Sequence, residues 1–269
     1  MAGSARSRCG LSDMSSANPP NHFKVALAEG RTQMGFWLAL ANADIAEICA
    51  GLGFDWLLVD AEHGPQTLPG IIEQLRAIAS CPPCAAVVRV PSSDPVAIRQ
   101  ILDLGATTLM VPMVETAEQA FRLVEACRYP PSGSRGIGGA RASRWGGIAT
   151  HVADANERLC LIAQIETIQG VENIEAIAGV DGIDALFIGP ADLAASAGLL
   201  GSANRERVRE LTMGALSRIL AAGKPAGILS RDLALLDAHL AGGASFVAVG
   251  IDAFALADAA RGLLDRFRQ

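Results

Sequence analysis

Lysine is nearly absent from this sequence. Lys24 and Lys224 are the only two among 269 residues, so arginine supplies almost all of the 22 basic residues. A mechanism that forms a Schiff base with a substrate carbonyl needs a lysine inside the active site. The chain therefore offers two candidates for that chemistry, and their positions in the fold decide whether either can serve.

The sequence also lacks long hydrophobic runs and an excess of positive charge. No apolar run reaches the roughly 18–20 residues of a membrane-spanning helix, because Asp44, Glu47 and Asp55 interrupt the longest apolar stretch, at 34–58. Acidic residues outnumber basic ones by 28 to 22, for a net charge of −6. A protein that binds the nucleic-acid backbone needs a basic face. We therefore expect neither a membrane protein nor a nucleic-acid-binding protein.

The N-terminal stretch, residues 1–21, contains arginine and serine but no apolar core of a secretory signal. We expect a disordered leader there, followed by one folded domain at 22–269. An organelle transit peptide is the alternative interpretation, and Asp13 argues against it, because such peptides are poor in acidic residues. The default location is the cytoplasm.

One pair of the six cysteines has CxxC spacing, Cys81-Pro-Pro-Cys84. A redox-active pair of this kind places its first cysteine at a helix N-terminus, where the thiol pKa is lowered. Here the pair instead follows a helical pattern and precedes the apolar run AAVVRV. A zinc site would need further ligands at matching spacing, and the chain has no second CxxC. A structural role is favoured.

The chain does contain a regular alternation of short apolar runs with amphipathic stretches, which is typical of repeated βαβ units. The apolar runs are continuous, so we expect strands buried on both faces. The predicted strands are 35–40, 56–60, 85–90, 108–113, 160–165, 185–188, 226–229 and 246–249, and the predicted helices are 43–51, 67–80, 94–104, 116–127, 169–177, 205–222, 231–241 and 252–267.

Eight strands alternating with eight helices predict an α/β protein with a single closed (β/α)₈ TIM barrel, a fold that needs about 250 residues. An open doubly wound sheet is the second possibility, but no GxGxxG turn follows the first strand. The connection at 128–159 has no clear strand and is rich in glycine and arginine. Its Arg135, Arg141 and Arg144 either recognise an anionic substrate or simply keep an exposed loop solvated.

In a parallel barrel the active site forms at the carboxyl ends of the strands. Polar residues follow several predicted strands, namely Asp60, Glu62 and His63 after the second, Arg89 after the third, Gln164 and Glu166 after the fifth, and Asp192 after the sixth. Charged side chains are rarely buried without a partner. We therefore expect these residues to converge on one mouth of the barrel.

Glu166 and Asp192 follow adjacent strands, and two close carboxylates repel each other unless a cation or a proton lies between them. Carboxylates with water suit hard cations such as Mg²⁺ or Mn²⁺. A metal site is therefore the favoured prediction, and an ion pair with Arg89 is the alternative. The turn at 189–193 leads into a helix, where backbone amides either hold a ligand carboxylate or are capped by Asp192.

His63 and Arg89 have functional and structural interpretations side by side. His63 is the only histidine that follows a predicted strand, which favours a general base over a structural histidine. Arg89 offers a rigid positive fork where negative charge develops. Alternatively, or in addition, it forms a salt bridge with Asp60 or Glu62.

Together these segments resemble a known family. The matching segments are GFWLAL, GFDWLLVDAEHGP, VVRVPSSDP, TLMVPMVETAEQA, RYPPSGSRGIGG, RASRW, QIET, DALFIGPADLA and FVAVGID. They are similar to the class II, metal-dependent pyruvate aldolases of the 4-hydroxy-2-oxoheptanedioate and 2-dehydro-3-deoxyglucarate aldolase family. The resemblance extends from about Phe23 to the C-terminus. Ala61, Gly64 and a shorter loop at 136–144 depart from the family pattern and leave the aldehyde open.

The resemblance implies a (β/α)₈ barrel that cleaves a 4-hydroxy-2-oxo acid reversibly to pyruvate and an aldehyde, with a divalent metal (Mg²⁺, Mn²⁺ or Co²⁺). It implies a cytoplasmic homo-hexamer with exchange of the C-terminal helix between subunits, and a place in aromatic catabolism. By position, it implies catalytic roles for His63, Arg89 and Asp103, metal ligation by Glu166 and Asp192, and substrate binding by Gln164, Ala191, Asp192 and Arg89. Asp103 matches an acid that raises the basicity of the histidine.

The lysine positions agree with metal rather than Schiff-base chemistry. Lys24 precedes the first predicted strand, and Lys224 directly precedes the seventh, at the end of the barrel opposite the mouth. Two other functions stay open. One is a different lyase that forms a metal-stabilised enolate from a carboxylated or CoA-linked acid. The other is a non-catalytic barrel that binds a small acid or acts as a scaffold.

Overall fold

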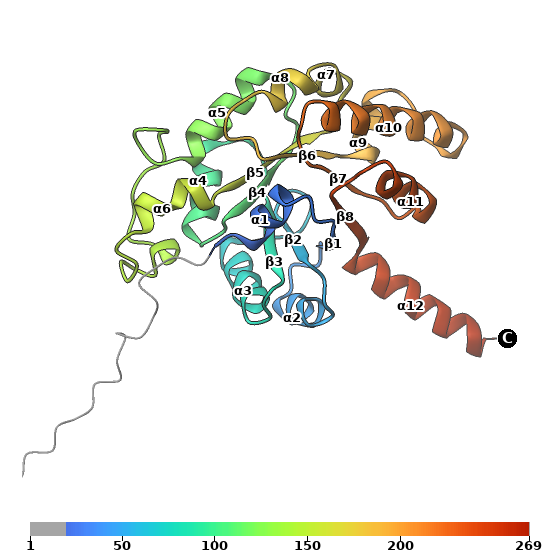
Figure 1. The fold of residues 1–269 in the computed structure, drawn as a ribbon. Coiled ribbons are helices and arrows are strands. Elements are labelled where there is room, and N and C mark those ends of the chain that lie inside the picture. Colours follow the sequence, from blue (N-terminus) through green and yellow to red (C-terminus); the bar gives the residue numbers. More distant parts are fainter. Residues whose placement is uncertain (1–19, 269) are drawn as a thin grey trace, which may run out of the picture.

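A computed structural model describes residues 20–268, so most of the predicted leader, residues 1–19, lies outside the described part of the chain. Eight parallel strands form a closed barrel in sequence order, with β1 paired to β8 (Figure 1). They are β1 (Gln33–Leu38), β2 (Trp56–Asp60), β3 (Ala85–Arg89), β4 (Thr108–Val111), β5 (Cys160–Ile165), β6 (Ala185–Ile188), β7 (Ala226–Leu229) and β8 (Phe246–Ile251). The predicted (β/α)₈ barrel is confirmed.

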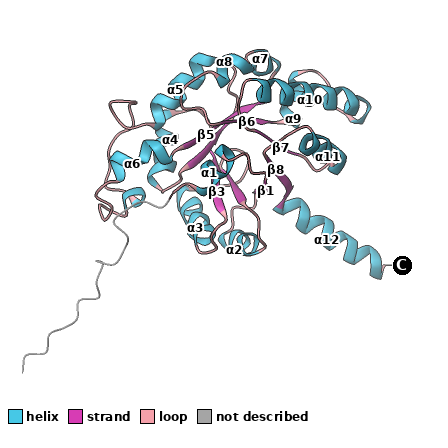
Figure 2. Cartoon of the chain, viewed as in Figure 1, coloured by secondary structure: helices cyan, strands magenta, loops and turns pink. Residues whose placement is uncertain are grey.

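Helices surround the barrel (Figure 2). They are α1 (His22–Ala28), α2 (Ala43–Gly51), α3 (Leu68–Ala79), α4 (Pro95–Asp103), α5 (Ala117–Cys127), α6 (His151–Arg158), α7 (Ile168–Glu172), α8 (Ile174–Ala178), α9 (Pro190–Ser196), α10 (Arg205–Ala221), α11 (Leu233–Ala241) and α12 (Asp252–Phe267). Sequence patterns did not predict α1 or α6. The helix predicted at 169–177 is two short helices that meet at Asn173.

Strand alternation divides the core into two layers. Trp56 and Leu58 of β2 belong to the cluster inside the barrel, whereas Leu57 and Val59 belong to the cluster between strands and helices. Successive strand side chains point to opposite faces, so the next inward position on β2 is Asp60. The same alternation brings polar residues to the carboxyl end of the barrel interior on β3 and β5.

The amino end of the barrel is closed by α1. Its Phe23 is fully buried, and its ring makes edge contacts with Trp56 and Phe246, with centroids 5.8 and 5.6 Å apart. Asn21, which precedes α1, donates hydrogen bonds to the Thr107 and Arg158 carbonyls ahead of β4 and β5. The barrel therefore opens only at its carboxyl end within the part of the chain that is described.

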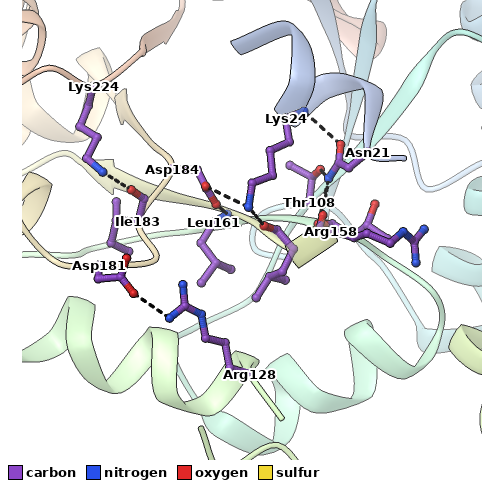
Figure 3. A network of polar contacts seen from close by, with 12 residues as sticks. Asn21, Lys24, Thr108, Arg128, Arg158, Leu161, Asp181, Ile183, Asp184 and Lys224 are labelled. Atoms are coloured by element: carbon purple, nitrogen blue, oxygen red, sulfur yellow. Dashed lines mark hydrogen bonds and ion pairs between the residues drawn. The ribbon is translucent and has the colours of Figure 1, made fainter. Parts of the chain in front are cut away.

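Both lysines lie at this closed amino end (Figure 3). The Nζ of Lys24 donates to the Leu159 carbonyl at 2.6 Å and lies 3.2 Å from Asp184 Oδ1, just ahead of β5 and β6. The Nζ of Lys224 donates to the Ile183 carbonyl at 2.6 Å. A Schiff base in the active site would need a lysine at the carboxyl ends of the strands. Both lysines lie at the amino ends, so neither serves that chemistry.

Cys81 and Cys84 connect α3 to β3 and are free thiols. Burial raises the pKa of Cys84 to about 12, with a further contribution from the nearby Cys81, so its reactive thiolate is scarce at neutral pH. This environment favours the structural interpretation of the CxxC pair. Within residues 20–268, no helix has both the length and the apolar character needed to cross a bilayer.

Candidate active site

A cavity of about 860 Å³ occupies the carboxyl-end mouth. Its wall includes Asp60, His63, Arg89, Gln164 and Asp192, together with apolar side chains such as those of Trp37 and Phe187. Five side chains that sequence patterns assigned to one mouth therefore lie around one cavity. The expected convergence of the strand ends explains this, since each residue ends or follows a strand of the closed barrel.

Arg89 is fixed in this mouth by two carboxylates. Its Nε and Nη2 donate to the two oxygens of Asp60 at 2.9 and 2.6 Å, and its Nη1 lies 2.9 Å from Glu62 Oε2. Asp60 and Arg89 are register partners on β2 and β3. Arg89 also lies over the ring of Trp37, 4.9 Å from the centroid. The salt bridges suggested as an alternative role for Arg89 are present, and they hold a rigid cation at the mouth.

Asp60 stays ionised despite its burial. Burial by itself favours the neutral acid, but the hydrogen bonds and charge of Arg89, with the Trp37 and His63 N–H donors, outweigh it and lower the pKa of Asp60. The Trp37 indole donates to Asp60 Oδ2 at 3.0 Å, and the backbone N–H of His63 donates to Oδ1 at 3.2 Å. Asp60 thus links the arginine to the turn that carries His63.

Glu166 lies in the same mouth and is 3% exposed. Its Oε1 accepts a hydrogen bond from the Met113 N–H at 2.7 Å, and its Oε2 accepts one from Gln164 Nε2 at 2.5 Å. Burial raises the pKa of Glu166 to about 7, and the charges of Glu62 and Asp192 act in the same direction. The Glu166 carboxylate is therefore buried close to two other acidic side chains, Glu62 and Asp192, and its negative charge is disfavoured there.

The residues present fit a divalent cation. Asp60 and Glu62 form ion pairs with Arg89, and the charges of Glu62, Asp192 and Arg89 all act on Glu166, so four carboxylates and one guanidinium share the mouth. The buried Oε1 of Gln164 has no hydrogen-bond partner among the described residues. The carboxylate oxygens of Glu166 and Asp192 are of the kind that hard divalent cations prefer, and a cation beside them would offset the surplus negative charge. Two protein carboxylates leave the other positions of the ion to water and substrate, so this is a sparser site than a cluster of three His, Cys, Asp or Glu side chains, and residues 20–268 contain no such cluster.

His63 is an exposed side chain in the turn after β2 and lines the cavity. Ala191 and Asp192, in the first turn of α9, line it as well. Asp103 lies elsewhere: it is the last residue of α4, which leads back to the amino end of β4, and it pairs with Arg135 at 3.0 Å. The structure thus separates Asp103 from the mouth of its own barrel, and its action on His63 stays a prediction.

The loop arginines are also remote from this mouth. Arg135, Arg141 and Arg144 lie with Gly105 and Thr107, ahead of β4, around a second cavity. A role in recognising substrate within one barrel is therefore not supported by their positions. It was not possible to predict this from the sequence, because a long loop after α5 reaches either end of a barrel.

Sequence reasoning assigned no role to three residues that shape the site. Trp37 supports both Asp60 and Arg89. Met113 has a positive φ of 57°, an uncommon conformation for a residue with a side chain, and its N–H meets Glu166. Gly189 leaves room for Glu166, since a Cβ there would lie 2.7 Å from Glu166 Oε2. In the sequence, a glycine directly after the sixth predicted strand could have indicated a close approach of the backbone to a neighbouring side chain. Nothing in the sequence indicated the positive φ of Met113.

A closed parallel barrel with a rigid arginine, buried carboxylates and an exposed histidine at its carboxyl-end mouth defines a barrel enzyme with an acid-rich active site. Residues 33–259 match the model of the HpcH/HpaI aldolase/citrate lyase family, and the chain belongs to that family. The sequence-based family assignment is thereby confirmed, and so is the assignment as a carbon–carbon lyase.

Individual relatives agree. The chain is 65% identical to a 4-hydroxy-2-oxovalerate aldolase of Novosphingobium aromaticivorans, over 93% of this chain and 96% of that protein. It is 49% identical to a 4-hydroxy-2-oxo-heptane-1,7-dioate aldolase of Salmonella dublin, over 92% and 94%. The crystal structure of a family member from Burkholderia cenocepacia J2315 superposes with a TM-score of 0.89 at 37% identity, over 93% of this chain and all of that one.

Proposed function

We propose that this enzyme cleaves a 4-hydroxy-2-oxo acid to pyruvate and an aldehyde, and runs the addition in reverse. The observation that carries the proposal is the fixed Arg89, held by Asp60 and Glu62 beside the buried Glu166–Gln164 pair. The names of the relatives support the same reaction. Positive charge that is already in place stabilises an enolate as it forms, without reorganisation.

Each residue has a defined part in this reaction. Glu166 and Asp192 would hold the divalent ion, and the ion would supply Lewis-acid polarisation of the 2-oxo group. His63 accepts the proton of the C4 hydroxyl, directly or through a water. The C3–C4 bond then breaks, its electron pair passes to the pyruvate enolate, and the aldehyde leaves. Arg89 stabilises the negative charge on the enolate oxygen, while Gln164 and the backbone at Ala191 bind the pyruvate part.

We extend the proposal to the setting of the enzyme. The metal is Mg²⁺, Mn²⁺ or Co²⁺, the folded domain spans 22–269, and the assembly is a cytoplasmic homo-hexamer with exchanged α12 helices and a role in aromatic catabolism. The family resemblance supports these points. Asp103 is expected to raise the basicity of a histidine, and its place at the far end of its own barrel is compatible only with an action across subunits.

A second candidate is a lyase that acts on a carboxylated or CoA-linked acid. Arg205, Arg209 and Arg231 line the same cavity, and Arg205 has no carboxylate partner among the described residues, which favours a substrate with a further anionic group. The family description includes citrate lyase. This candidate also forms an enolate when a carbon–carbon bond breaks. It differs in the second product, which is released from a carboxylated or CoA-linked acid instead of a 4-hydroxy-2-oxo acid.

A pyruvate-release assay tests the proposal. The full-length enzyme is supplied with 4-hydroxy-2-oxo acids of increasing length, with EDTA and then with added Mg²⁺, Mn²⁺ or Co²⁺. We expect pyruvate release that EDTA abolishes and metal restores. Activity indifferent to the chelator would exclude the metal at Glu166 and Asp192. Absence of pyruvate from every such acid, with activity on a CoA-linked acid, would favour the second candidate.

A further inference from the structure

A second cavity, of about 920 Å³, lies at the amino end of the barrel, opposite the active-site mouth. Its floor includes Gly105 and Thr107 ahead of β4 and Leu159 ahead of β5, and its walls come from α4, α6 and the loop at 141–148. In Figure 1, α4 and α6 lie together at the side of the barrel away from α12. The cavity is therefore separate from the site described above.

Arginine dominates the wall of this amino-end cavity. Five line it: Arg76, Arg135, Arg141, Arg144 and Arg158. Within residues 20–268, Arg76, Arg141 and Arg144 form no ion pair with a carboxylate, and Arg135 is paired with Asp103. Arg141 does donate to the Leu104 carbonyl at 2.5 Å, which orders its side chain. The described residues thus leave a surplus of positive charge in a concave space.

Two buried nitrogen atoms in the wall have no hydrogen-bond partner among the described residues: Nε of Arg135 and Nδ1 of His151. Both residues are about nine-tenths buried or more, at 6% exposed each. Arg135 is held over the ring of Tyr129, 4.4 Å from its centroid, and the Tyr129 hydroxyl lies 3.4 Å from His151 Nε2. An unpartnered buried donor is costly, so the fixed Nε of Arg135 indicates a missing acceptor. The Nδ1 of His151 donates in one tautomer and accepts in the other, so it serves as an additional polar atom of the wall.

The electrostatics of the wall point the same way. Burial lowers the pKa of Arg141, and the positive charges of Arg76 and Arg144 lower it further. Burial likewise lowers the pKa of His151, and Arg135 and Arg158 add to the effect. Like charges held together in a partly desolvated space repel, and an anion placed among them removes that repulsion.

We propose that the amino-end cavity binds a small anion with at least two negative charges. Guanidinium groups recognise phosphate and carboxylate with the same planar fork, so a phosphate ester and a dicarboxylic acid share the required chemistry. The Trp145, Ile148 and Leu159 side chains add apolar wall for the carbon skeleton of such a ligand. The cavity is separate from the mouth of its own barrel. Of its wall residues, Arg135 pairs with Asp103, which the proposed function places beside a neighbouring subunit's histidine, whereas Arg76 and Arg144 have no part in the proposed reaction.

Calorimetric titration of the full-length protein tests the site, with inorganic phosphate in one arm and succinate in the other. Mg²⁺ and saturating pyruvate are present, so that the mouth is occupied. We expect one binding event per chain, and at least about tenfold weaker binding in Arg144→Gln and in the double variant Arg76→Gln/Arg144→Gln, because each change removes a charged donor. Aldolase turnover of both variants should stay at the wild-type level.

Arg122→Gln is the matched control. It removes the same charge from an exposed pair with Glu118 on α5 and should bind both probes as the wild type does. Preference for one probe identifies the ligand as a phosphate or a carboxylate. Equal binding by the double variant and the wild type would overturn the proposal. A second result would also overturn the proposal: the wild type binds neither probe, and the double variant dissociates the assembly. That result would show that acidic residues of a second copy fill the cavity.

Discussion

The pair formed by Asp60 and Arg89 shows how single residues set the chemistry of this mouth. A buried ion pair adds little to stability overall, because removing two charges from water costs nearly as much as their attraction returns. Breaking such a pair is costly, since it leaves one buried charge alone. The contacts to Trp37 and Glu62 therefore serve to place the guanidinium rather than to stabilise the fold.

Arg89→Lys tests that placement. Lysine keeps the charge but has no planar fork, so it cannot bind both oxygens of Asp60 and also reach Glu62. We expect kcat to fall by about 100-fold or more, the usual effect of losing a fixed donor to a developing negative charge. Affinity for Mn²⁺, measured by calorimetry, should stay unchanged. Arg122→Lys, on the exposed pair of α5, is the control. Wild-type turnover in Arg89→Lys would remove Arg89 from its proposed role.

The lowered pKa of Asp60 predicts how stability depends on pH. The folded-state pKa lies below the unfolded value, so the contribution of Asp60 is complete above the unfolded pKa of about 3.9 and is lost as pH falls through the folded value. Asp60→Asn should cost about 3–5 kcal/mol at pH 7, because Arg89 loses its partner.

Urea unfolding at pH 7, 5 and 3.5 measures this effect. The deficit of Asp60→Asn relative to the wild type should be the same at pH 7 and pH 5 and should begin to shrink at pH 3.5. Asp181→Asn, which alters an exposed pair with Arg128, should leave stability nearly unchanged at every pH. A deficit for Asp60→Asn that ignores pH would indicate a steric rather than an electrostatic cause.

Among the elements, the junction of β6 and α9 shapes the side of the mouth where we propose that the metal binds. Gly189 ends the strand segment, Pro190 begins the helix, and Asp192 lies in its first turn. The junction passes so close to β5 that a Cβ at position 189 would lie 3.0 Å from Glu166 Cβ and 3.1 Å from Gln164 Nε2. Glycine is needed here for close approach.

Gly189→Ala should therefore push Glu166 out of place. We expect Mn²⁺ affinity to fall by about tenfold or more, since misplacing a ligand removes a large part of its charge-assisted contact. Thermal stability should fall as well. Gly51→Ala is the control, because a Cβ at that helical position meets nothing within 4 Å. Unchanged metal affinity in Gly189→Ala, measured by calorimetry, would argue against Glu166 as a ligand.

The elements themselves were largely predictable from the sequence. All eight strands were predicted, because a parallel barrel buries both faces of each strand and leaves continuous apolar runs. Boundaries moved by a few residues: β1 begins at Gln33 rather than 35, and β8 extends to Ile251. Local capping fixes the starts of two of these helices: the Asp94 side chain caps α4, and Thr116 and Gln119 form a capping box at the start of α5.

Two helices were missed because tertiary packing, not local pattern, creates them. The short α1 is stabilised by its Phe23, whose ring packs against Trp56 and Phe246 inside the barrel. The polar α6 packs into a loop region that shows no apolar periodicity. At the site, strand-end residues were predictable from topology. The remote position of Asp103 follows from the same topology, because a helix between two parallel strands ends at the amino end of the next strand, whereas the family resemblance alone gave Asp103 a role and not a place.

The whole molecule has two polar ends and one protruding helix. The carboxyl end collects carboxylates around Arg89, while the amino end carries both lysines and the arginine-lined cavity. In Figure 1, α12 extends away from the barrel. Its Leu256, Leu263 and Phe267 are 63, 61 and 79% exposed. A row of exposed apolar residues on one helix marks an interaction surface, and the proposed homo-hexamer supplies a second copy as its partner.

Leu263→Glu tests this assembly. If α12 packs on a neighbouring subunit, a buried charge without a partner should break the contact, and the measured mass should fall from about six times the 27.9 kDa chain toward smaller species. Light scattering after size-exclusion chromatography measures the mass. Leu52→Glu makes the same change at a 70% exposed position after α2 and should leave the mass unaltered. A smaller assembly should also lose activity, because Asp103 then has no neighbouring histidine to act on. A wild-type monomer would contradict the hexamer, and an unchanged mass in Leu263→Glu would remove α12 from the interface.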